Sequence, residues 1–458
     1  MAILSPASAD LSTNIAVVVA GGGACGLVAA LAAHDAGAEV VVIERDPLPR
    51  GSTSMSLGAM CAAGSRDQAR LGIDDDAERF IADVMAKSRG TADPIITRVV
   101  ATESGAALDW LAAHHDIPVR LDPDWPPAFG HSAARMHVTP GRSGADLMDR
   151  LIAACDRAEI PILTDACLTG LFVADGRIAG VRYERPNGGV EDIGCGALVL
   201  ATCGFGGNAA MIAEHIPAMI NARYFGWDGN RGDAIRLGVA AGAAVADMDA
   251  YQGLGLLAHP QSIDVHPRLL IEGGFQVNRA GRRFSDELAD VSGQGARVIA
   301  QPEGFAWVIY DGRIATSCGD LPQYVALRDA GGVRFAATLE ALATRVGIDP
   351  SALATTLATI EPRRADPFGR VFTTPPLCSP FFAIRVTGAL FHTQGGLQID
   401  AAARVIRRNG TVFPNLFAGG GAARGISGTG ASGYLPGAGL CCAVTLGRVA
   451  GRGAATLV

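Results

Sequence analysis

The hydrophobic positions near the start of the chain follow the order strand, helix, strand. The run Ile15–Ala20 is apolar and rich in Val, which is typical of a strand buried on both faces. Leu27–Ala36 predicts a helix of small residues, which Gly37 ends. Ala38–Ile43 is a second Val-rich run and predicts another buried strand. This order is typical of a βαβ unit in an α/β sheet.

Glycines fill the turn between the first strand and the helix, at Gly21, Gly22, Gly23 and Gly26, in the spacing G-x-G-x-x-G. In a dinucleotide site, Gly21 allows a tight turn, Gly23 lets the backbone approach a pyrophosphate, and Gly26 lets helix and strand pack closely. The helix N-terminus offers free N–H groups and a positive dipole end to the phosphates. Glu44 follows about twenty residues later and can accept both ribose hydroxyls. The strand, glycines, helix, second strand and Glu44 all have the expected order and spacing. This favours a dinucleotide site over the alternative, which is a glycine-rich turn in an ordinary α/β sheet.

Further strands are predicted in the middle of the chain. Ile160–Asp165, Cys167–Ala174 and Gly176–Glu184 have strand patterns, and a Pro-Asn-Gly-Gly turn follows them. We expect them to form an antiparallel insertion. Ala197–Thr202 predicts another buried strand that runs into glycines, and these should adjoin the adenine half of the same cofactor.

The composition changes twice along the chain. From about Gly253 to Pro380, prolines, charges and short helices alternate without glycine loops. Ala389–Asp400 returns to the buried, glycine-rich pattern, and Ala438–Ala455 predicts a final helix. The expected fold class is α/β, with a discontinuous Rossmann-like nucleotide-binding domain (residues 1–252 and 381–458) and an inserted α+β capping domain (residues 253–380).

Composition narrows the function classes. The chain has 458 residues, which suits two domains, and a formal net charge of −7 with scattered basic residues, so nucleic acid is not an expected partner. Neither a signal peptide nor a membrane-spanning apolar run is evident. The 10 cysteines lack CxxC spacing, which favours reduced thiols in a cytoplasmic protein without a metal site. The oligomeric state is left open.

Two polar features can be read in more than one way. The loop Gly51–Gly64 is rich in small and hydroxyl residues, and it predicts a cradle for a flavin ring and its ribityl chain or, alternatively, a surface turn. Asp233 begins a helix, where it can act as a cap or, if the protein is a flavoprotein, hold a ribityl hydroxyl. His131, His137 and Arg142 lie in a polar segment, and we expect each to bind nearby backbone or solvent rather than substrate.

Nearly the full length of the chain resembles the superfamily of FAD-dependent fumarate reductases and 3-ketosteroid Δ1-dehydrogenases. The matching stretches are the glycine motif with Glu44, Leu200–Asn208, Gly229–Gly238, Val277–Glu287, Phe391–Asp400 and Asn415–Leu440. The resemblance implies an FAD domain, a mobile capping domain and a reaction at the isoalloxazine ring. The residues expected to contact FAD are Gly21, Gly23, Ala24, Cys25, Gly26, Glu44, Arg45, Ser52, Thr53, Ser54, Gly58, Ala59, Thr202, Gly204, Asn208, Asp233, Gly420, Gly437, Ala438 and Leu440.

Departures from the superfamily pattern narrow the choice within it. The histidine that bonds covalently to FAD in succinate dehydrogenases would fall near Ser52, so we expect non-covalent FAD. The proton-donating Arg of the fumarate reductases would fall near Val291, and their carboxylate-binding His would fall at Leu254. Another Arg of that family, which binds a substrate carboxylate, would fall near Gly433-Tyr434. Of this whole set of residues, only His392 remains. A dicarboxylate needs its charges paired, so these losses argue against fumarate.

The segment from Tyr434 to Gly439 is similar to the Y-P-G-A-G segment of the ketosteroid dehydrogenases, with Leu435 as an extra residue. In that family the Tyr hydroxyl and a Gly N–H hold the substrate ketone and favour its enol. The resemblance therefore implies these roles for Tyr434 and Gly439, against the alternative that Tyr434 packs in a turn. The family's Tyr base would also fall near Val291 and is missing.

Three other residues are candidates for catalysis. His392 precedes Gly395-Gly396 in the superfamily motif and should face substrate. Arg424 can pair with a carboxylate on the substrate or with solvent. Tyr251 is a candidate base, with a core aromatic as the favoured alternative.

The sequence thus predicts an FAD-dependent oxidoreductase that acts on a CH–CH bond beside a carbonyl. The leading hypothesis is α,β-dehydrogenation of a cyclic ketone, such as a 3-ketosteroid or oxocyclohexane-type substrate, by hydride transfer to flavin N5. The first alternative is reduction of an unsaturated carboxylate, as in fumarate reductases. The second is a flavoprotein in which FAD is structural or the site is degenerate. The expected partners are a small carbonyl compound and an electron acceptor that the sequence does not identify.

Overall fold

The computed structural model describes residues 1–125 and 127–458, which divide into two compact units. The first consists of Met1–His215, Gly226–Tyr251 and His392–Val458. The second consists of Ile216–Phe225 and Gln252–Phe391. The expected α/β fold class is confirmed, with sheets that are mixed rather than purely parallel.

The first unit is built on a sheet in which β2 is an interior strand. Val17 of β2 is in parallel register with Val40 of β3 on one side and Ala197 of β10 on the other. The strand order is β1 (Ala2–Leu4), β8 (Cys167–Ala174), β9 (Arg177–Glu184), β10 (Val190–Leu200), β2 (Asn14–Ala20), β3 (Val40–Ile43), β7 (Ile162–Leu163), with β20 (Val412–Ala418) pairing with β10 and with β19 (Arg404–Ile406).

The predicted antiparallel insertion is confirmed for Cys167–Ala174 and Gly176–Glu184, because β9 pairs antiparallel with both β8 and β10. It is wrong for Ile160–Asp165, because the strand there, β7, pairs parallel with β3. The strand predicted at Ala197–Thr202 is longer than expected and begins at Val190. Its first residues are partly exposed and pair with β9, so their pattern lacks the continuous apolar run of the buried end. Smaller sheets pair β4 (Met60–Cys61) and β5 (Arg120–Leu121) with β6 (Met136–Val138), and β12 (Val245–Ala246) with β18 (Gly396–Leu397).

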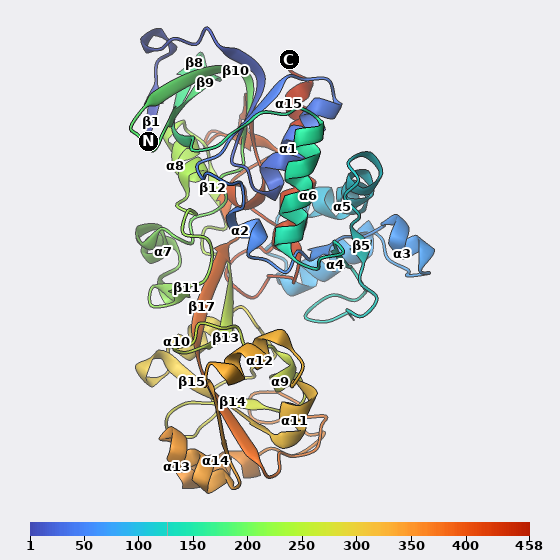
Figure 1. Ribbon diagram of the computed structural model, residues 1–458, viewed down its shortest axis with the longest axis vertical. Helices are drawn as coiled ribbons and strands as arrows, with labels where there is room; N and C mark the ends of the chain where they lie inside the picture. Colours follow the sequence, from blue (N-terminus) through green and yellow to red (C-terminus); the bar gives the residue numbers. More distant parts are fainter. Residues whose placement is uncertain (126) are drawn as a thin grey trace. The chain divides into compact units, whose positions relative to one another are not determined.

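Helix α1 (Ala24–Asp35) packs against α15 (Ala438–Ala455), and the two lie side by side in Figure 1. Glycines make this approach possible, since a Cβ at Gly447 or Gly451 would overlap the backbone oxygens of Cys25 and Ala29. Residues Ala24–Ala33 are all buried, as expected of a helix that is apolar on every side. The other helices of this unit are η1 (Pro6–Ser8), α2 (Gly51–Ser54), α3 (Arg66–Arg70), α4 (Ala77–Lys87), α5 (Pro94–His114), α6 (Gly144–Arg157), α7 (Ala209–His215), α8 (Asp233–Ala240) and η4 (Gly420–Ala422).

The second unit has its own sheet and its own apolar core. Its strand order is β11 (Arg223–Tyr224), β17 (Phe381–Thr393), β15 (Phe305–Asp311), β14 (Phe275–Val277), with β13 (Tyr251–Ala258) and β16 (Val333–Ala336) also pairing with β17. Its helices are η2 (Pro217–Met219), α9 (Arg268–Ile271), α10 (Gln294–Ile299), η3 (Pro302–Gly304), α11 (Gly312–Ser317), α12 (Pro322–Asp329), α13 (Leu339–Val346) and α14 (Pro350–Ala358). The chain passes through this unit twice, first over Ile216–Phe225 and then from Gln252 in β13 to Phe391 in β17.

The second unit starts at Gln252, one residue before the expected boundary at 252/253, and two larger segments also differ from the expected division. Phe381–Phe391 belongs to the second unit because β17 pairs with β15 over Phe381–Thr387 and with β16 over Phe381–Ile384. Ile216–Phe225 also belongs there because β11 pairs with Ala389 and Leu390 of β17. Composition does not mark either segment, since the pairing joins residues that are far apart in sequence.

The motif Arg283-Phe284 with Glu287 is part of a buried ion network in the second unit. Arg283 and Arg370 both bind the Glu287 carboxylate, at 2.8 and 2.7 Å, and Arg283 also pairs with Asp366. Their side chains are 4% exposed or less. Removing one partner would leave a buried charge uncompensated, so this part of the motif has a structural role.

Candidate active site

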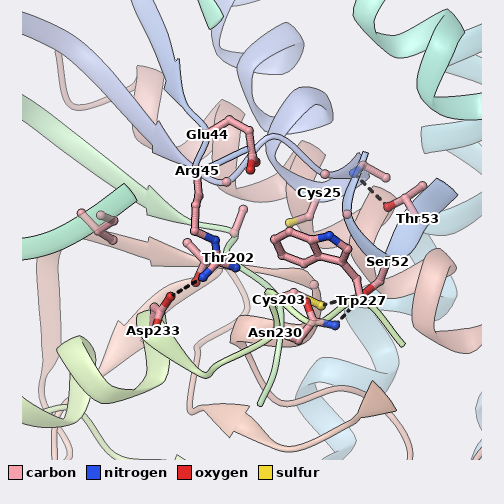
Figure 2. Close-up of a pocket in the computed structure, with 18 of the residues that line it drawn as sticks. Cys25, Glu44, Arg45, Ser52, Thr53, Thr202, Cys203, Trp227, Asn230 and Asp233 are labelled. Carbon is pink, nitrogen blue, oxygen red and sulfur yellow. Dashed lines mark hydrogen bonds and ion pairs between the residues drawn. The ribbon is translucent and has the colours of Figure 1, made fainter. Parts of the chain in front are cut away.

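A pocket lies where the carboxyl ends of β2, β3 and β10 meet the starts of α1 and α2 in the first unit (Figure 2). Open α/β sheets bind their ligands at this edge. The pocket has a volume of about 750 Å³, including space open to solvent, and small-molecule sites span ~300–1,000 Å³. The predicted FAD contacts that line it are Gly21, Gly23, Ala24, Cys25, Glu44, Arg45, Ser52, Thr53, Thr202, Asp233 and Gly420.

The three motif glycines have separate steric roles. Gly21 has a φ of +108°, a backbone conformation that favours glycine and that allows the tight turn at this position. A Cβ at Gly26 would overlap the carbonyl oxygen of Gly21, so glycine is needed where α1 meets the turn. A Cβ at Gly23 would meet nothing nearer than Thr53 Oγ1 at 3.7 Å, and Gly23 caps α1 without a side chain. The helix N-terminus is therefore open to an anionic group in the pocket.

Glu44 lies at the end of β3 with its carboxylate held by the backbone. Oε2 accepts from the Gly22 N–H at 2.5 Å, and Oε1 accepts from the Asp46 N–H at 2.9 Å. Burial raises the pKa of Glu44, and the two backbone hydrogen bonds oppose that shift. The carboxylate is thus fixed at the turn, where the predicted ribose contact requires it.

Hydroxyl groups tie the α2 loop and the neighbouring segments together around the pocket. Thr53 Oγ1 accepts from the Ala24 N–H at 3.2 Å, Thr202 Oγ1 accepts from the Ala234 N–H at 3.1 Å, and the Asn230 amide donates to Ser52 Oγ at 2.6 Å. These bonds join segments up to 178 residues apart in the chain. The first residues of the predicted hydroxyl loop, Gly51–Thr53, therefore line the pocket, whereas the rest of the loop does not.

Arg45 and Trp227 lie next to one another in the pocket (Figure 2). The Arg45 guanidinium stands 4.8 Å from the centroid of the Trp227 ring and 3.4 Å from Asp233 Oδ2, and it also donates to the Gly229 carbonyl. Sequence reasoning did not single out Trp227 or Asn230. The available signal was their place in or beside the Gly229–Gly238 motif.

Other predicted cofactor residues do not line this pocket: Gly26, Ser54, Gly58, Ala59, Gly204, Asn208, Gly437, Ala438 and Leu440. Gly58, with a φ of +69°, packs against Ser143. Asn208 caps α7, where its Oδ1 accepts from the Met211 N–H at 3.2 Å, and its amide donates to the Arg231 carbonyl. Gly204 packs against Thr393. Gly437 is the N-cap of α15, with a φ of +80°, and Ala438 begins that helix.

The predicted catalytic residues His392, Tyr434 and Gly439 meet at the start of α15. The rings of His392 and Tyr434 make an edge contact with centroids 5.5 Å apart. A Cβ at Gly439 would lie 3.0 Å from His392 Cε1, so glycine leaves the space that the imidazole fills. Sequence reasoning missed Gln394, whose amide nitrogen lies 2.5 Å from His392 Nδ1.

Burial keeps both rings uncharged near neutral pH. It lowers the pKa of His392 from 6.5 to about 4. It also raises the pKa of Tyr434 above its usual 10, and backbone hydrogen bonds of Gly439 and Gly437 act in the opposite direction. The start of α15 thus presents a neutral imidazole and a neutral phenol.

Arg424 was expected to pair with a substrate carboxylate or with solvent, and its partners in the structure are neither. Its guanidinium pairs with Asp93 at 2.6 Å and Asp247 at 2.7 Å, and its side chain is 14% exposed. Its charge is therefore compensated within the protein rather than by substrate or solvent. Tyr251 begins β13, and its side chain is 6% exposed, as expected of a core aromatic.

In the part of the chain that the structure covers, no group of His, Cys, Asp or Glu is arranged to hold a metal. Within the same residues, no helix has the length and apolar character needed to cross a membrane.

Comparison with known proteins agrees with this geometry. Residues 16–446 match the family described as FAD binding domain. The chain is 29% identical over 462 residues to the probable fumarate reductase Ifc3 of Shewanella frigidimarina, covering 98% of this chain and 76% of that protein.

Two solved structures are also similar. The open conformation of a flavocytochrome c3 fumarate reductase has a TM-score of 0.84 and 28% identity, covering 98% of this chain and 80% of that one. The 3-ketosteroid-Δ4-(5α)-dehydrogenase of Rhodococcus jostii RHA1 has a TM-score of 0.81 and 26% identity, covering 99% and 100%. The pocket fits FAD, because it has an open helix N-terminus for the phosphates and a fixed Glu44 carboxylate. The chain therefore belongs to the FAD binding domain family and is an FAD-dependent oxidoreductase that acts on CH–CH bonds.

Proposed function

We propose that this oxidoreductase removes hydrogen from the CH–CH bond beside a neutral carbonyl, as in the α,β-dehydrogenation of a cyclic ketone. The observation that carries the proposal is the neutral pair His392 and Tyr434 at the start of α15. A neutral donor can polarise a ketone without placing a full charge beside it.

The charges of the described first unit support a neutral substrate. Arg424 is the cation that sequence reasoning placed nearest to substrate, and Asp93 and Asp247 already compensate it. A dicarboxylate held in a desolvated site needs cations to pair with its charges. A ketone has no such requirement, and its oxygen needs hydrogen-bond donors.

Each residue has a defined part in the proposed reaction. The Tyr434 hydroxyl donates to the ketone oxygen, which makes the α-proton more acidic. His392 adds a second neutral polar group, held in place by Gln394. Bound FAD would supply the acceptor, at N5, for the hydride that leaves the β-carbon, and the α-proton would pass to solvent water. The N-terminus of α15, which begins without a capping side chain at Gly437, favours negative charge at this end of the site.

An anaerobic flavin assay tests the proposal. The flavin-loaded protein is mixed without oxygen with a saturated 3-ketosteroid, a substituted cyclohexanone or succinate, and the flavin absorbance is followed. We expect a ketone to bleach the flavin and succinate to leave it oxidised. Bleaching by succinate alone would contradict the proposal.

A second candidate function is the reduction of an unsaturated carboxylate. It is supported by the fumarate reductases among the similar proteins. The test is the reverse reaction, in which chemically reduced flavin is mixed anaerobically with fumarate or with a cyclic enone. Reoxidation by fumarate alone would favour this candidate, and no response to any compound would favour a structural FAD.

A further inference from the structure

A chain of buried polar contacts in the first unit leads from α4 to the turn that carries Tyr434. The Arg135 guanidinium binds both oxygens of Asp75, at 2.8 and 2.7 Å, and also pairs with Asp83 of α4. The side chains of Arg135 and Asp75 are fully buried. Because a buried cation with two acidic partners is costly to disrupt, Arg135 is a fixed point in this part of the fold.

His131 connects Arg135 to the turn. Its Nδ1 lies 3.4 Å from Arg135 Nη1, and its Nε2 lies 3.0 Å from the Pro436 carbonyl oxygen. A guanidinium can only donate hydrogen bonds, and a carbonyl can only accept them. His131 therefore accepts at Nδ1 and donates from Nε2, which is the neutral Nε2–H tautomer. Burial lowers the pKa of His131, in agreement with the neutral form.

Pro436 lies between Tyr434 and Gly437, the N-cap of α15. The turn has a second anchor beside it, because the Leu435 side chain is 1% exposed and packs against Gly130. A Cβ at Gly130 would come within 2.8 Å of Leu435 Cδ2, and the φ of Gly130 is +109°. Leu435 is also the residue by which this chain exceeds the Y-P-G-A-G pattern. Gly130 thus packs against the extra residue, Leu435, and its neighbour His131 binds the carbonyl of the following residue, Pro436.

We propose that His131 is a positioning residue for Tyr434, since its Nε2–H fixes the Pro436 carbonyl while Arg135, held by Asp75 and Asp83, selects the tautomer that can donate. The inference rests on the proposed role of Tyr434. It adds a residue that does not touch substrate and acts through the turn. From the sequence, His131 was expected to bind nearby backbone or solvent. In the structure it binds the backbone carbonyl of Pro436, in the turn before α15.

The first test uses hydrogen exchange and is independent of turnover. Amide exchange of the segment 435–441 is measured by mass spectrometry in flavin-loaded wild type, His131→Gln, His131→Leu and His115→Gln. Gln places an amide N–H near the position of Nε2, whereas Leu has no donor. His115 is a matched control, because it is as buried as His131, 8% exposed in each case, and binds Asp35 instead. We expect faster exchange in His131→Leu alone, and unchanged exchange in that variant would overturn the proposal.

The second test is a double-mutant cycle on flavin reduction by ketone. Because small misplacements of a catalytic group cost about 10- to 100-fold in rate, we expect His131→Leu to slow the reaction by about that factor and His131→Gln to restore most of it. In a Tyr434→Phe background, His131→Leu should have little further effect, because both changes act through one hydroxyl. If the two effects multiply instead, His131 does not act through Tyr434. A wild-type rate in Tyr434→Phe itself would refute the role of Tyr434. The hydrogen-exchange result would still show whether His131 holds the turn at Pro436.

A third measurement needs no variant. Long-range nitrogen–proton NMR of the wild-type imidazoles should show His131 as the Nε2–H tautomer. Detection of the Nδ1–H tautomer would contradict the proposal even if His131→Leu fails to fold.

Discussion

The imidazole of His392 lies edge-on against the phenol ring of Tyr434, with centroids 5.5 Å apart and ring planes at 73°. The two residues are on different segments, one at the end of β17 and the other before α15. Edge-to-face contact of this kind is a favoured geometry for two rings. It places two neutral polar groups together, and the proposed chemistry depends on both.

Removing the Tyr434 hydroxyl should slow flavin reduction without unfolding the protein. Tyr434→Phe retains the ring that packs on His392, so the thermal transition and flavin content should hardly change. Loss of one preorganised donor costs about two orders of magnitude in rate, or about 2.7 kcal/mol of transition-state stabilisation. Stopped-flow flavin reduction by ketone measures this loss. Tyr183→Phe is the control, because its hydroxyl binds Glu191 and should not affect the rate. Equal rates for both variants would make Tyr434 structural.

The low pKa of His392 predicts a pH dependence of stability. The folded protein takes up this proton near pH 4, whereas the unfolded chain does so near pH 6.5. The unfolded state therefore binds more protons between these values, and the contribution of His392 to the free energy of unfolding falls as the pH drops from 6.5 towards 4. Above pH 6.5 the contribution is fully present.

Urea unfolding of wild type and His392→Gln at several pH values between 4 and 7 measures this effect. The difference between the two proteins should shrink as the pH falls through this window. Other buried histidines titrate in both proteins and cancel in the comparison. A difference that is constant with pH would mean that His392 titrates normally in the folded state.

Two alanine substitutions in the glycine motif should fail in different ways. Gly26→Ala places a Cβ on the Gly21 carbonyl oxygen, and such overpacking costs about 1–3 kcal/mol or more. Gly23→Ala meets nothing nearer than Thr53 Oγ1 at 3.7 Å, so the protein should fold but lose flavin affinity at the helix N-terminus. Thermal unfolding of the flavin-free proteins and their flavin titration separate the two effects. The steric argument is wrong if Gly26→Ala is as stable as Gly23→Ala.

Arg424 should support stability rather than bind substrate. Arg424→Met leaves Asp93 and Asp247 without their cation, and breaking a buried pair costs about 3–5 kcal/mol, less where water reaches it. Arg404→Met is the control, because its pair with Asp400 is 42% exposed on the Arg side and should cost less than about 1 kcal/mol. Chemical denaturation measures both. Wild-type stability in Arg424→Met, together with a raised KM for a carboxylate substrate, would assign Arg424 to substrate binding.

FAD should be released on denaturation. Ser52 occupies the place where the superfamily's covalent histidine would fall, and its hydroxyl accepts from Asn230 instead. Acid precipitation should therefore leave yellow FAD in the supernatant. Flavin that stays with the precipitated chain would show a covalent link.

Local sequence determined the strand–helix–strand nucleotide-binding motif of the first unit. Strand, glycine turn, helix and Glu44 lie within one continuous stretch, and each follows from backbone and packing rules that act over a few residues. The apolar runs therefore predicted β2, α1 and β3 closely, and the glycine spacing predicted FAD. The residues proposed at the start of α15 were also predicted from local sequence, since Tyr434 and Gly439 lie in one short motif.

Tertiary structure decided the partners. Asp93 and Asp247 lie 331 and 177 residues from Arg424, and Pro436 lies 305 residues from His131, so no local pattern could pair them. The boundaries of the second unit could not be predicted from local sequence either. They depend on hydrogen bonds between β11 and β17, which are far apart in the chain. The sequence by itself determined the cofactor and the types of side chain near it, because those depend on short-range geometry. Which charges are compensated, and which hydroxyls and imidazoles are held in place, depended on the folding of distant segments against one another.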